Sequence, residues 1–533
     1  MKLPYKPFWA VLHLLAIISI LTSLSTGMRI AILDYPQLLL FNHWLPQGEV
    51  HSVHTFSGLL FLLLTIAYCW LRRIVPQLSK KSHRVEITNR FRALFHCWQL
   101  LLKWLLYLCT PLLLLSGLLL LVDLAYFSAN TILTLHFISA VALLIYTLAH
   151  AITYLVQRGQ MVIKILFLPI KQWQSVHTKM LVAVFIVGLS NYAYFTLFGH
   201  HKLYISKIPT TDIITLDGMM NEPQWQATPS VTINTRGGQN FINGESTVTV
   251  KALHNEHEMY MFVQWQDANA SFYHLPLLKT AQGWQVQEQG FNRFNETKFY
   301  EDKFAIMLSD YCALGAAGTA HLGTKPLKDK PENWSGKGFH YSMRGLVDLW
   351  HWKAVRTNYM GLMDDNYIAE PDIVRAGHRR YTAGYQTDAK QSGSYTMNWQ
   401  WYSPQKVTPK RLPIDPKWIN DYQKPALRTA TNGFLPWFDT APYQADKDTY
   451  PIGTLLPSIL YTSNQFEGDR ADVRAKAHWQ DGIWSLEIFR QLNTGSTNDT
   501  VIENDVCFWF AAFDRSQIAH TRHSLPVKIE LAQ

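Results

Sequence analysis

Histidines inside apolar stretches are the first residues in this sequence that could do chemistry. The stretch 134–155, TLHFISAVALLIYTLAHAITYL, is apolar but carries His136 near one end and His150 near the other. On an α-helix at ~100° per residue, these two side chains lie within about 40° of each other, so both imidazoles occupy one face. At ~1.5 Å per residue they are roughly 21 Å apart along the axis, at two depths of a membrane core ~30 Å thick. The spacing predicts two metal centres rather than one.

The elements that must position these histidines are membrane spans. The first apolar run follows Lys2 and Lys6, as the apolar part of a signal peptide would. No small-residue cleavage site comes after it, so we expect a retained anchor. The remainder of the 533-residue chain is rich in Trp, Tyr, Asp, Asn and Gly and reads as a soluble domain. Segments long and apolar enough to span are Phe8–Ser25, Val53–Leu71, His96–Val122, Thr131–Val156 and Met180–Phe198.

The basic residues indicate how these spans are oriented. Loop 72–92 holds seven Lys or Arg residues against one acid, and loop 157–179 holds four against none. The alternate loops are nearly neutral, so the positive-inside rule predicts a cytoplasmic amino terminus and, after five spans, an exported carboxy-terminal domain. We expect a bacterial inner membrane with this domain in the periplasm. The two loops account for about the whole net charge of +9, so the basic balance reflects topology and no nucleic-acid partner is expected.

With this topology the membrane histidines form two pairs. His13 and His150 lie near the cytoplasmic side, while His54 and His136 open their spans near the outer side. Interfacial histidines are a simpler reading of any one of them, and zinc would require more ligands at each level. Bis-imidazole ligation of two b-type haems explains both pairs, because ionisable residues within spans are costly and usually functional. His51 remains an alternative to His54.

The order and spacing of these histidines resemble the bacterial cytochrome b-561 family. Proteins of that family are four-helix, di-haem membrane proteins that exchange electrons with quinones. The resemblance covers residues 1–156 and implies a four-span cytochrome b domain there. Residues 157–204 then form a cytoplasmic loop, a fifth transmembrane helix acting as a tether, and a linker. No C-x-x-C-H motif occurs, so covalent haem attachment is not expected.

Residues 205–533 read as an all-β domain. The stretch 246–267 is two runs of β-forming residues around a polar turn, as in a hairpin. Many short strands with Gly, Asn and Asp turns favour a β-sandwich, whereas the middle, about 312–445, is expected to be a long irregular region of functional importance. Further expected strands are 303–308, 484–492, 506–514 and 525–531.

Several motifs of this domain carry a second resemblance. The opening ITLDGMMNEPQW (214–225) resembles a sandwich family that includes carbohydrate-binding modules and haem-binding domains. The motifs EDKFAIML, DLWHWKAVRTNYMGLMDDNY, WSLEIFRQL and HTRHSLPVKIEL resemble the ethylbenzene dehydrogenase gamma-subunit type of domain, over nearly all of 210–533. That resemblance implies one b-type haem that exchanges electrons with a periplasmic redox protein, such as a molybdenum enzyme.

The same resemblance implies axial ligands for this haem. The family's methionine ligand falls on Met307, which by itself would more often be a core residue. Its lysine ligand falls in HTRHS, where this chain has histidines, so Met307 and His523 are the expected pair. A thioether with an imidazole gives a relatively high potential among b-type haems. His520, His321 and His351 remain alternatives for the second ligand.

Other side chains near these motifs allow different readings. Lys353 or Arg356 could pair with haem propionates. The tryptophans Trp265, Trp350 and Trp352 could instead stack against sugars, which would make the domain a binding module.

The expected function is electron transfer between the quinone pool and a periplasmic partner by a multi-haem b-type cytochrome embedded in membrane lipid. One alternative is a direct oxidoreductase acting on a small species such as superoxide at the membrane haems. Another is a ligand- or carbohydrate-binding sandwich on a cytochrome b anchor. Cys312 and Cys507, both in the exported domain, could form a disulfide.

Overall fold

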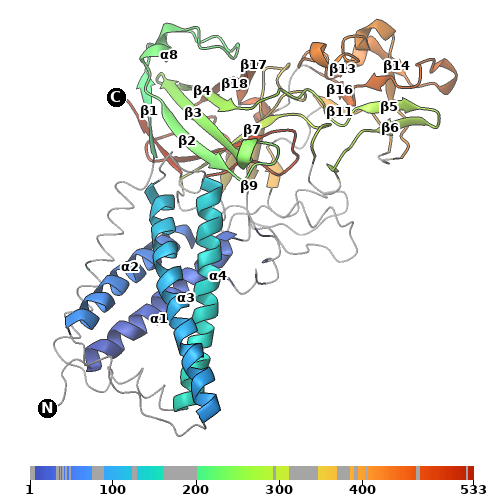
Figure 1. The fold of residues 1–533 in the computed structure, drawn as a ribbon. Helices are drawn as coiled ribbons and strands as arrows, with labels where there is room; N and C mark the ends of the chain where they lie inside the picture. The colour runs from blue at the N-terminus through green and yellow to red at the C-terminus, as the bar shows by residue number, and fades with distance from the viewer. Residues whose placement is uncertain are drawn as a thin grey trace. The chain divides into compact units, whose positions relative to one another are not determined.

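The computed structural model (Figure 1) divides into two units, Met1–Gly199 and His200–Gln533, which are described separately. In the first unit, four helices and a few positions between them are described, and the expected fifth span, 180–198, lies outside the described residues apart from Ile186. In the second unit, residues 201–533 are described except 292–295, 311, 313–345, 369–384, 389–393, 402, 404, 464–467 and 524–525.

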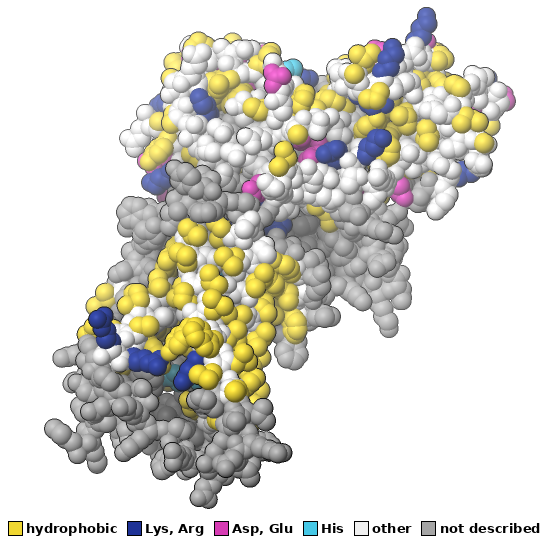
Figure 2. Space-filling model, viewed as in Figure 1, with side chains coloured by type: hydrophobic (Ala, Val, Ile, Leu, Met, Phe, Trp, Pro, Cys, Tyr) yellow, Lys and Arg dark blue, Asp and Glu magenta, His cyan; other side chains and the backbone are white. Residues whose placement is uncertain are grey.

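Four long helices form the described part of the first unit. Each contains a segment of 21 to 27 residues that is long and apolar enough to cross a membrane, so the first four expected spans are confirmed as helices. Only 17–22% of each segment is buried, and Figure 2 shows hydrophobic side chains over the visible face of these helices. Apolar side chains turned outward suit a lipid environment. The helices are α1 (Lys6–Ala31), α2 (Val50–Ile74), α3 (Asn89–Val122) and α4 (Ala129–Arg158).

The helices pack chiefly as two pairs, α1 with α2 and α3 with α4. Between α1 and α2, the hydroxyl of Ser19 donates to the Ser57 carbonyl at 2.7 Å and that of Ser23 donates to the Ser57 hydroxyl at 2.7 Å. Small hydroxyl residues allow two helix backbones to approach closely and bond across the contact. Leu12, Leu64 and Leu71 fill the same interface.

A 12-stranded sheet is the framework of the second unit. Its order is β10-β9-β8-β7-β19-β20-β1-β3-β4-β18-β17, with β2 paired to β3, and β1 runs parallel to both β20 and β3. The strands are β1 (His201–Lys207), β2 (Val231–Arg236), β3 (Glu245–His254), β4 (Glu258–Gln266), β7 (Lys303–Ser309), β8 (Val347–Lys353), β9 (Asp364–Ile368), β10 (Tyr385–Thr387), β17 (Arg474–Gln480), β18 (Ile483–Gln491), β19 (Cys507–Phe513) and β20 (Val527–Leu531).

This sheet curls until strands from its two halves face each other. Trp265 on β4 stacks on Phe304 on β7 with ring centroids 4.6 Å apart, although several strands separate β4 from β7 in the sheet. Trp352 on β8 likewise meets Trp484 on β18 at 4.9 Å. The inner faces thus bury one shared core, as in a sandwich. The expected fold class, a helical anchor followed by a sandwich-like β domain, is confirmed.

Three smaller sheets surround a second apolar cluster that includes Leu277, Trp284 and Tyr422. Their strands are short, and the connections between them contain several single-turn 3-10 helices. The strands are β5 (Leu277–Thr280), β6 (Gly283–Val286) and β15 (Leu455–Leu456) in the first, β11 (Tyr395–Met397), β13 (Leu435–Pro436) and β16 (Ile459–Tyr461) in the second, and β12 (Arg411–Pro413) and β14 (Thr440–Pro442) in the third.

Most expected strands are present. The hairpin over 246–267 is β3 and β4, and the other four expected strands correspond to β7, β18, β19 and β20. The expectation of an irregular middle region was wrong for 347–368, which supplies β8 and β9 to the main sheet. Alternation explains the pairing, because Trp350 and Trp352 enter the core while the residues between them face the other way. Cys312 and Cys507 form a disulfide with their Cα atoms 5.3 Å apart.

Candidate functional site

Two histidine pairs lie inside the helical unit. His54 on α2 faces His136 on α4 with ring centroids 6.1 Å apart. His13 on α1 faces His150 on α4 at 6.2 Å. An imidazole nitrogen binds a transition metal at about 2 Å, so two rings on opposite sides of one metal have centroids roughly 6 Å apart. Both pairs therefore have the spacing of bis-imidazole ligation. The structure brings together the same partners that the span depths predict.

The pair His54 and His136, called the outer pair below, is held in orientation by hydrogen bonds from the neighbouring helices. Nδ1 of His54 lies 3.0 Å from the Ser23 carbonyl and 3.1 Å from the Thr26 hydroxyl, both on α1. Nδ1 of His136 lies 3.1 Å from the Ser116 hydroxyl on α3 and also bonds the backbone of Leu113. A carbonyl partner places the proton on Nδ1, so Nε2 becomes the nitrogen that can bind a metal.

Glycines lie directly against the two outer imidazoles. A Cβ added to Gly27 would come within 2.9 Å of Cε1 of His54, and one added to Gly117 within 3.1 Å of Cε1 of His136. Each glycine follows a hydroxyl residue that bonds the same ring, Thr26 in one helix and Ser116 in the other. The two helix pairs thus present their outer histidine in the same way. Sequence reasoning missed these residues. A Thr-Gly or Ser-Gly dipeptide in a span, at the depth of a histidine in the neighbouring span, is the signal that could have found them.

Two tyrosines flank His150 in the second pair, His13 with His150, which is called the inner pair below. The ring of His150 lies 5.4 Å from that of Tyr146 and 4.7 Å from that of Tyr154, one helical turn to either side. The Tyr146 hydroxyl is 3.4 Å from Nδ1 of His150, a weak bond that nevertheless orients the ring. The outer alternative, His51, has a side chain outside the described residues, whereas His54 faces His136.

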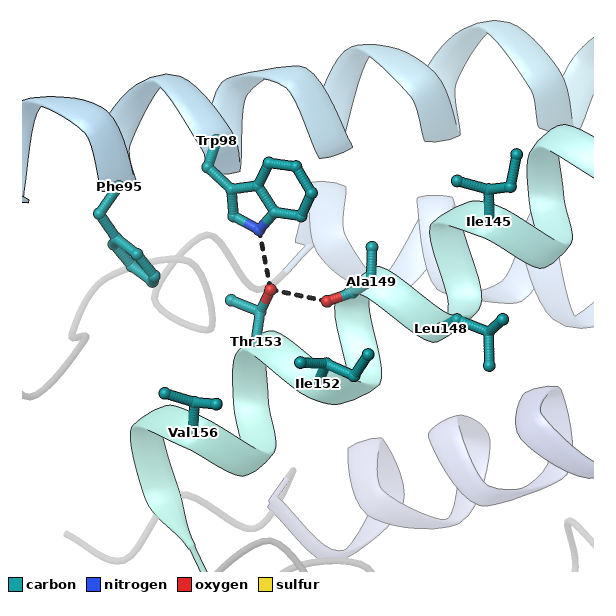
Figure 3. A pocket seen from close by; sticks show the side chains of 8 residues that line it. All are labelled: Phe95, Trp98, Ile145, Leu148, Ala149, Ile152, Thr153 and Val156. Carbon is teal, nitrogen blue, oxygen red and sulfur yellow. Dashed lines mark hydrogen bonds between the residues drawn. The ribbon is translucent and has the colours of Figure 1, made fainter.

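An apolar pocket lies beside these sites, between α3 and α4 (Figure 3). Its polar atoms bond each other, since Nε1 of Trp98 donates to the Thr153 hydroxyl at 2.9 Å and that hydroxyl donates to the Ala149 carbonyl at 2.6 Å. The pocket therefore presents a hydrocarbon wall of the kind that lipid chains cover. Its remaining lining residues are Phe95, Ile145, Leu148, Ile152 and Val156.

In the β domain, Met307 lies on the face of the large sheet that points away from the main core. It pairs with Trp509 on one side and Leu349 on the other and packs in a small cluster with them. The next row on this face is Ala511, Ala305 and His351 in register. The small side chains of two adjacent alanines therefore occupy this area of the sheet next to Met307.

His351 is the histidine that borders this area. Its Nε2 is buried and has no hydrogen-bond partner. Burial lowers the pKa of His351 well below its ordinary value, with Lys303 nearby acting in the same direction, so the ring is neutral. A buried neutral imidazole with an orphaned nitrogen fits a metal ligand. His351 and His520 both contact the ring of Phe513, at centroid distances of 5.3 and 4.8 Å.

The structure does not bring the expected ligand His523 to Met307. Nε2 of His523 accepts a hydrogen bond from the Phe510 amide at 2.9 Å, and its ring stacks on Phe510. The Phe510 side chain belongs to the main core, on the opposite face of the sheet from Met307. His321, another alternative, lies outside the described residues.

The cations considered for haem propionates already have carboxylate partners. Lys353 forms an ion pair with Asp364, and Arg356 forms one with Glu301. Burial by itself would raise the pKa of Glu301, but Arg356 and the bond to His274 hold it below its ordinary range. These pairs connect β7, β8 and β9 at one end of the Met307 face.

The tryptophans considered for sugar stacking are core residues. Trp265 is 1% exposed, and Trp350 and Trp352 are fully buried. A stacking platform must be reached by its ligand, so that reading of these three residues was wrong.

A helical anchor joined to a sandwich-like β domain defines the general class of this protein. Residues 222–524, more than half of the chain, match the ethylbenzene dehydrogenase family, so the chain belongs to that family. No curated protein matches it.

Some solved structures of carbohydrate-binding proteins have a low similarity to this chain. A carbohydrate binding module family 9 from Caldicellulosiruptor kristjanssonii, in complex with glucose, is 10% identical, with 62% of this chain and 95% of that chain covered and a TM-score of 0.23. The same module in complex with cellotriose is 10% identical, with 62% of this chain and 93% of that chain covered and a TM-score of 0.22. A protein from Bacteroides uniformis described as a candidate carbohydrate-binding protein is 5% identical, with 62% of this chain and 100% of that chain covered and a TM-score of 0.24.

Proposed function

We propose that this protein is a membrane-anchored b-type cytochrome that carries electrons between a quinone and a redox partner on the side of the β domain. The observation that carries the proposal is the presence of two histidine pairs in the apolar unit. In each pair the rings come from different helices, with centroids 6.1 and 6.2 Å apart. The resemblance of residues 1–156 to the cytochrome b-561 family supports the same reading. The membrane would be a bacterial inner membrane and the partner a periplasmic protein, such as a molybdenum enzyme.

The residues present fit the proposed cofactors. His54 with His136 and His13 with His150 would each hold one b haem, which supplies one-electron chemistry when bound. Ser23, Thr26 and Ser116 would orient the outer ligands, and the surrounding apolar side chains would exclude water. In the β domain, Met307 would hold a third haem. The orphaned Nε2 of His351 favours this residue as its second ligand over His523, whose Nε2 is already bonded.

Quinone-linked redox cycling tests the proposal. The purified full chain, with haem bound, is mixed anaerobically with a short-chain quinol, and separately the dithionite-reduced protein is mixed with the quinone. We expect at least one mixing to change the b-type absorption bands fully, because a quinone-linked conduit must exchange electrons with the quinone in one direction. A haem-loaded protein that neither quinol nor quinone affects would contradict the proposal.

A further inference from the structure

A group of aspartates lies where β8, β9 and the connection after β18 meet. One carboxylate oxygen each from Asp348 on β8, Asp365 on β9 and Asp499 after β18 lies within 4.8 Å of the other two. Asp388, just after β10, joins them, because its amide donates to the Asp365 carbonyl at 3.5 Å and its carboxyl interacts with that of Asp499. Residues distant in the sequence therefore converge at one point, the aspartate cluster. None of them belongs to the histidine sites.

The bonds within the aspartate cluster leave one side of it unsatisfied. Oδ2 of Asp348 accepts from the Thr500 amide at 3.1 Å, and Oδ2 of Asp499 accepts from the Thr494 hydroxyl at 2.6 Å. Both of these Oδ2 atoms also face Nη2 of Arg490, at 3.0 and 2.7 Å. Within the part of the chain that the structure describes, no group donates to the Oδ1 atoms of Asp348 and Asp499.

Asp365 is the most unusual member of the cluster. It is fully buried, and neither of its carboxylate oxygens accepts a hydrogen bond from an N–H or hydroxyl group of the described residues. Both oxygens of Asp388 are in the same condition. Among the described residues, the side-chain bonds of Asp365 and Asp388 are to other carboxyls, those of Asp348 and Asp499, and such contacts need a shared proton or a cation. Native proteins rarely leave buried acceptors unsatisfied, since desolvating a polar group without a hydrogen bond is unfavourable and more so when the group is charged.

The charges in the cluster do not balance either. Among the described residues, the buried guanidinium of Arg490 pairs with Asp348 and Asp499, and no ion pair involves Asp365 or Asp388. These carboxyls therefore need either protons or another cation.

We propose that Asp348, Asp365, Asp388 and Asp499 bind a calcium ion. One oxygen each of Asp348, Asp365 and Asp499, within 4.8 Å of one another, fits around a Ca²⁺ ion, which takes six to eight oxygen ligands at about 2.3–2.6 Å, and Asp388 and water would complete the set. Mg²⁺ fits less well, because it requires shorter bonds of about 2.0–2.1 Å and usually retains water. The ion ties the edge strands β8, β9 and β10 to the connection after β18 and stabilises this edge of the sheet.

A second acidic group differs from the aspartate cluster in the partners of its oxygens. Asp267, Asp302 and Asp514 also converge, but most of their oxygens have partners. Asp302 accepts from the amides of Ser271 and Arg515, and Asp514 is bound by the Arg515 side chain. Only Oδ2 of Asp267 is without one. The second group therefore serves as the internal control.

Calcium binding to the full chain tests the proposal. The detergent-solubilised protein is stripped with EGTA and dialysed against CaCl₂ or MgCl₂, and bound metal and the thermal midpoint of the β domain are measured. We expect about one Ca²⁺ per chain, a higher midpoint with Ca²⁺ than with EGTA, and a weaker response to Mg²⁺. Asp365→Asn should weaken calcium binding by roughly a hundredfold or more and remove the shift of the midpoint.

Matched variants distinguish the possible outcomes. Asp267→Asn should bind calcium like the wild type, and Asp388→Asn, at a less buried position, should weaken binding even where Asp365→Asn fails to fold. A wild-type chain that binds no Ca²⁺ and has the same midpoint in EGTA would overturn the proposal and show that protons neutralise the cluster. Loss of binding in Asp267→Asn, with Asp365→Asn and Asp388→Asn unaffected, would also overturn it.

Discussion

The helical unit and the β domain present their candidate sites in different ways. In the helices, the four paired histidines lie in apolar segments, so the depth of each one indicates its partner, and the observed pairs at 6.1 and 6.2 Å agree with that prediction. In the β domain, histidines, lysines and acids are common, and membership of one sheet face separates His351 from His523. Ionisable residues are informative where burial is costly and alternatives are few.

The largest effect is expected from removing a membrane histidine. His136→Ala deletes one ligand of the outer pair, so we expect about one haem fewer per chain with the inner pair unaffected. Haem content by pyridine haemochrome and a potentiometric titration that loses one component measure this. His51→Ala is the matched control and should keep its haem. Full haem content in His136→Ala would contradict the pairing.

Enlarging the glycines beside the outer imidazoles should have the next largest effect. Gly117→Val places a side chain where a Cβ already meets Cε1 of His136 at 3.1 Å, so the ring must shift. We expect reduced occupancy or an altered spectrum of the outer haem, measured by low-temperature absorption. Gly58→Val is the control, since nothing lies within 4 Å of its added Cβ. Equal behaviour of the two variants would show that the glycine has no part in positioning the ligand.

In the β domain, Met307→Leu should change the potential of the third haem more than its occupancy. Leucine keeps the volume but removes the thioether, so the midpoint should fall by on the order of 100 mV. Met261→Leu, at a fully buried core position, is the control and should leave the potential unchanged. His351→Ala should lose this haem and His523→Ala should retain it. The reverse result for the two histidines would restore His523 as the ligand.

The smallest effect is a pH dependence in the β domain. Glu487 accepts bonds from the Asp217 and Gly218 amides and from Trp225, but burial raises its pKa to about 7. A carboxyl with a raised pKa binds more protons when folded, so its contribution is complete below pH 4.5 and is lost as pH rises toward 7.

Urea unfolding followed by tryptophan fluorescence at pH 5 and pH 7 measures this loss. We expect the free energy of unfolding to fall by on the order of 1 kcal/mol, and by less in Glu487→Gln. Glu530→Gln, whose half-exposed side chain pairs with Lys202, should behave as the wild type. An unchanged pH dependence in Glu487→Gln would contradict the assignment.

The sequence predicts the helices, the histidine pairs and most core strands, because apolar length and alternation are local properties. It does not predict β8 and β9, since their pairing depends on β7 and on each other across long insertions. For the same reason, the sequence does not predict that Met307 and His523 lie on opposite faces of the sheet. The convergence of Asp348 and Asp499 likewise depends on tertiary contacts that no sequence spacing records.

Haem content of the full chain, with and without its membrane histidines, tests the central claim most directly. The wild type and a variant with all four replaced by alanine, at His13, His54, His136 and His150, are compared by pyridine haemochrome after expression with ample haem. We predict about three b-type haems per wild-type chain and about one in the variant, held by the β domain. Equal haem content in the two proteins would contradict the account, since the helices would then hold none.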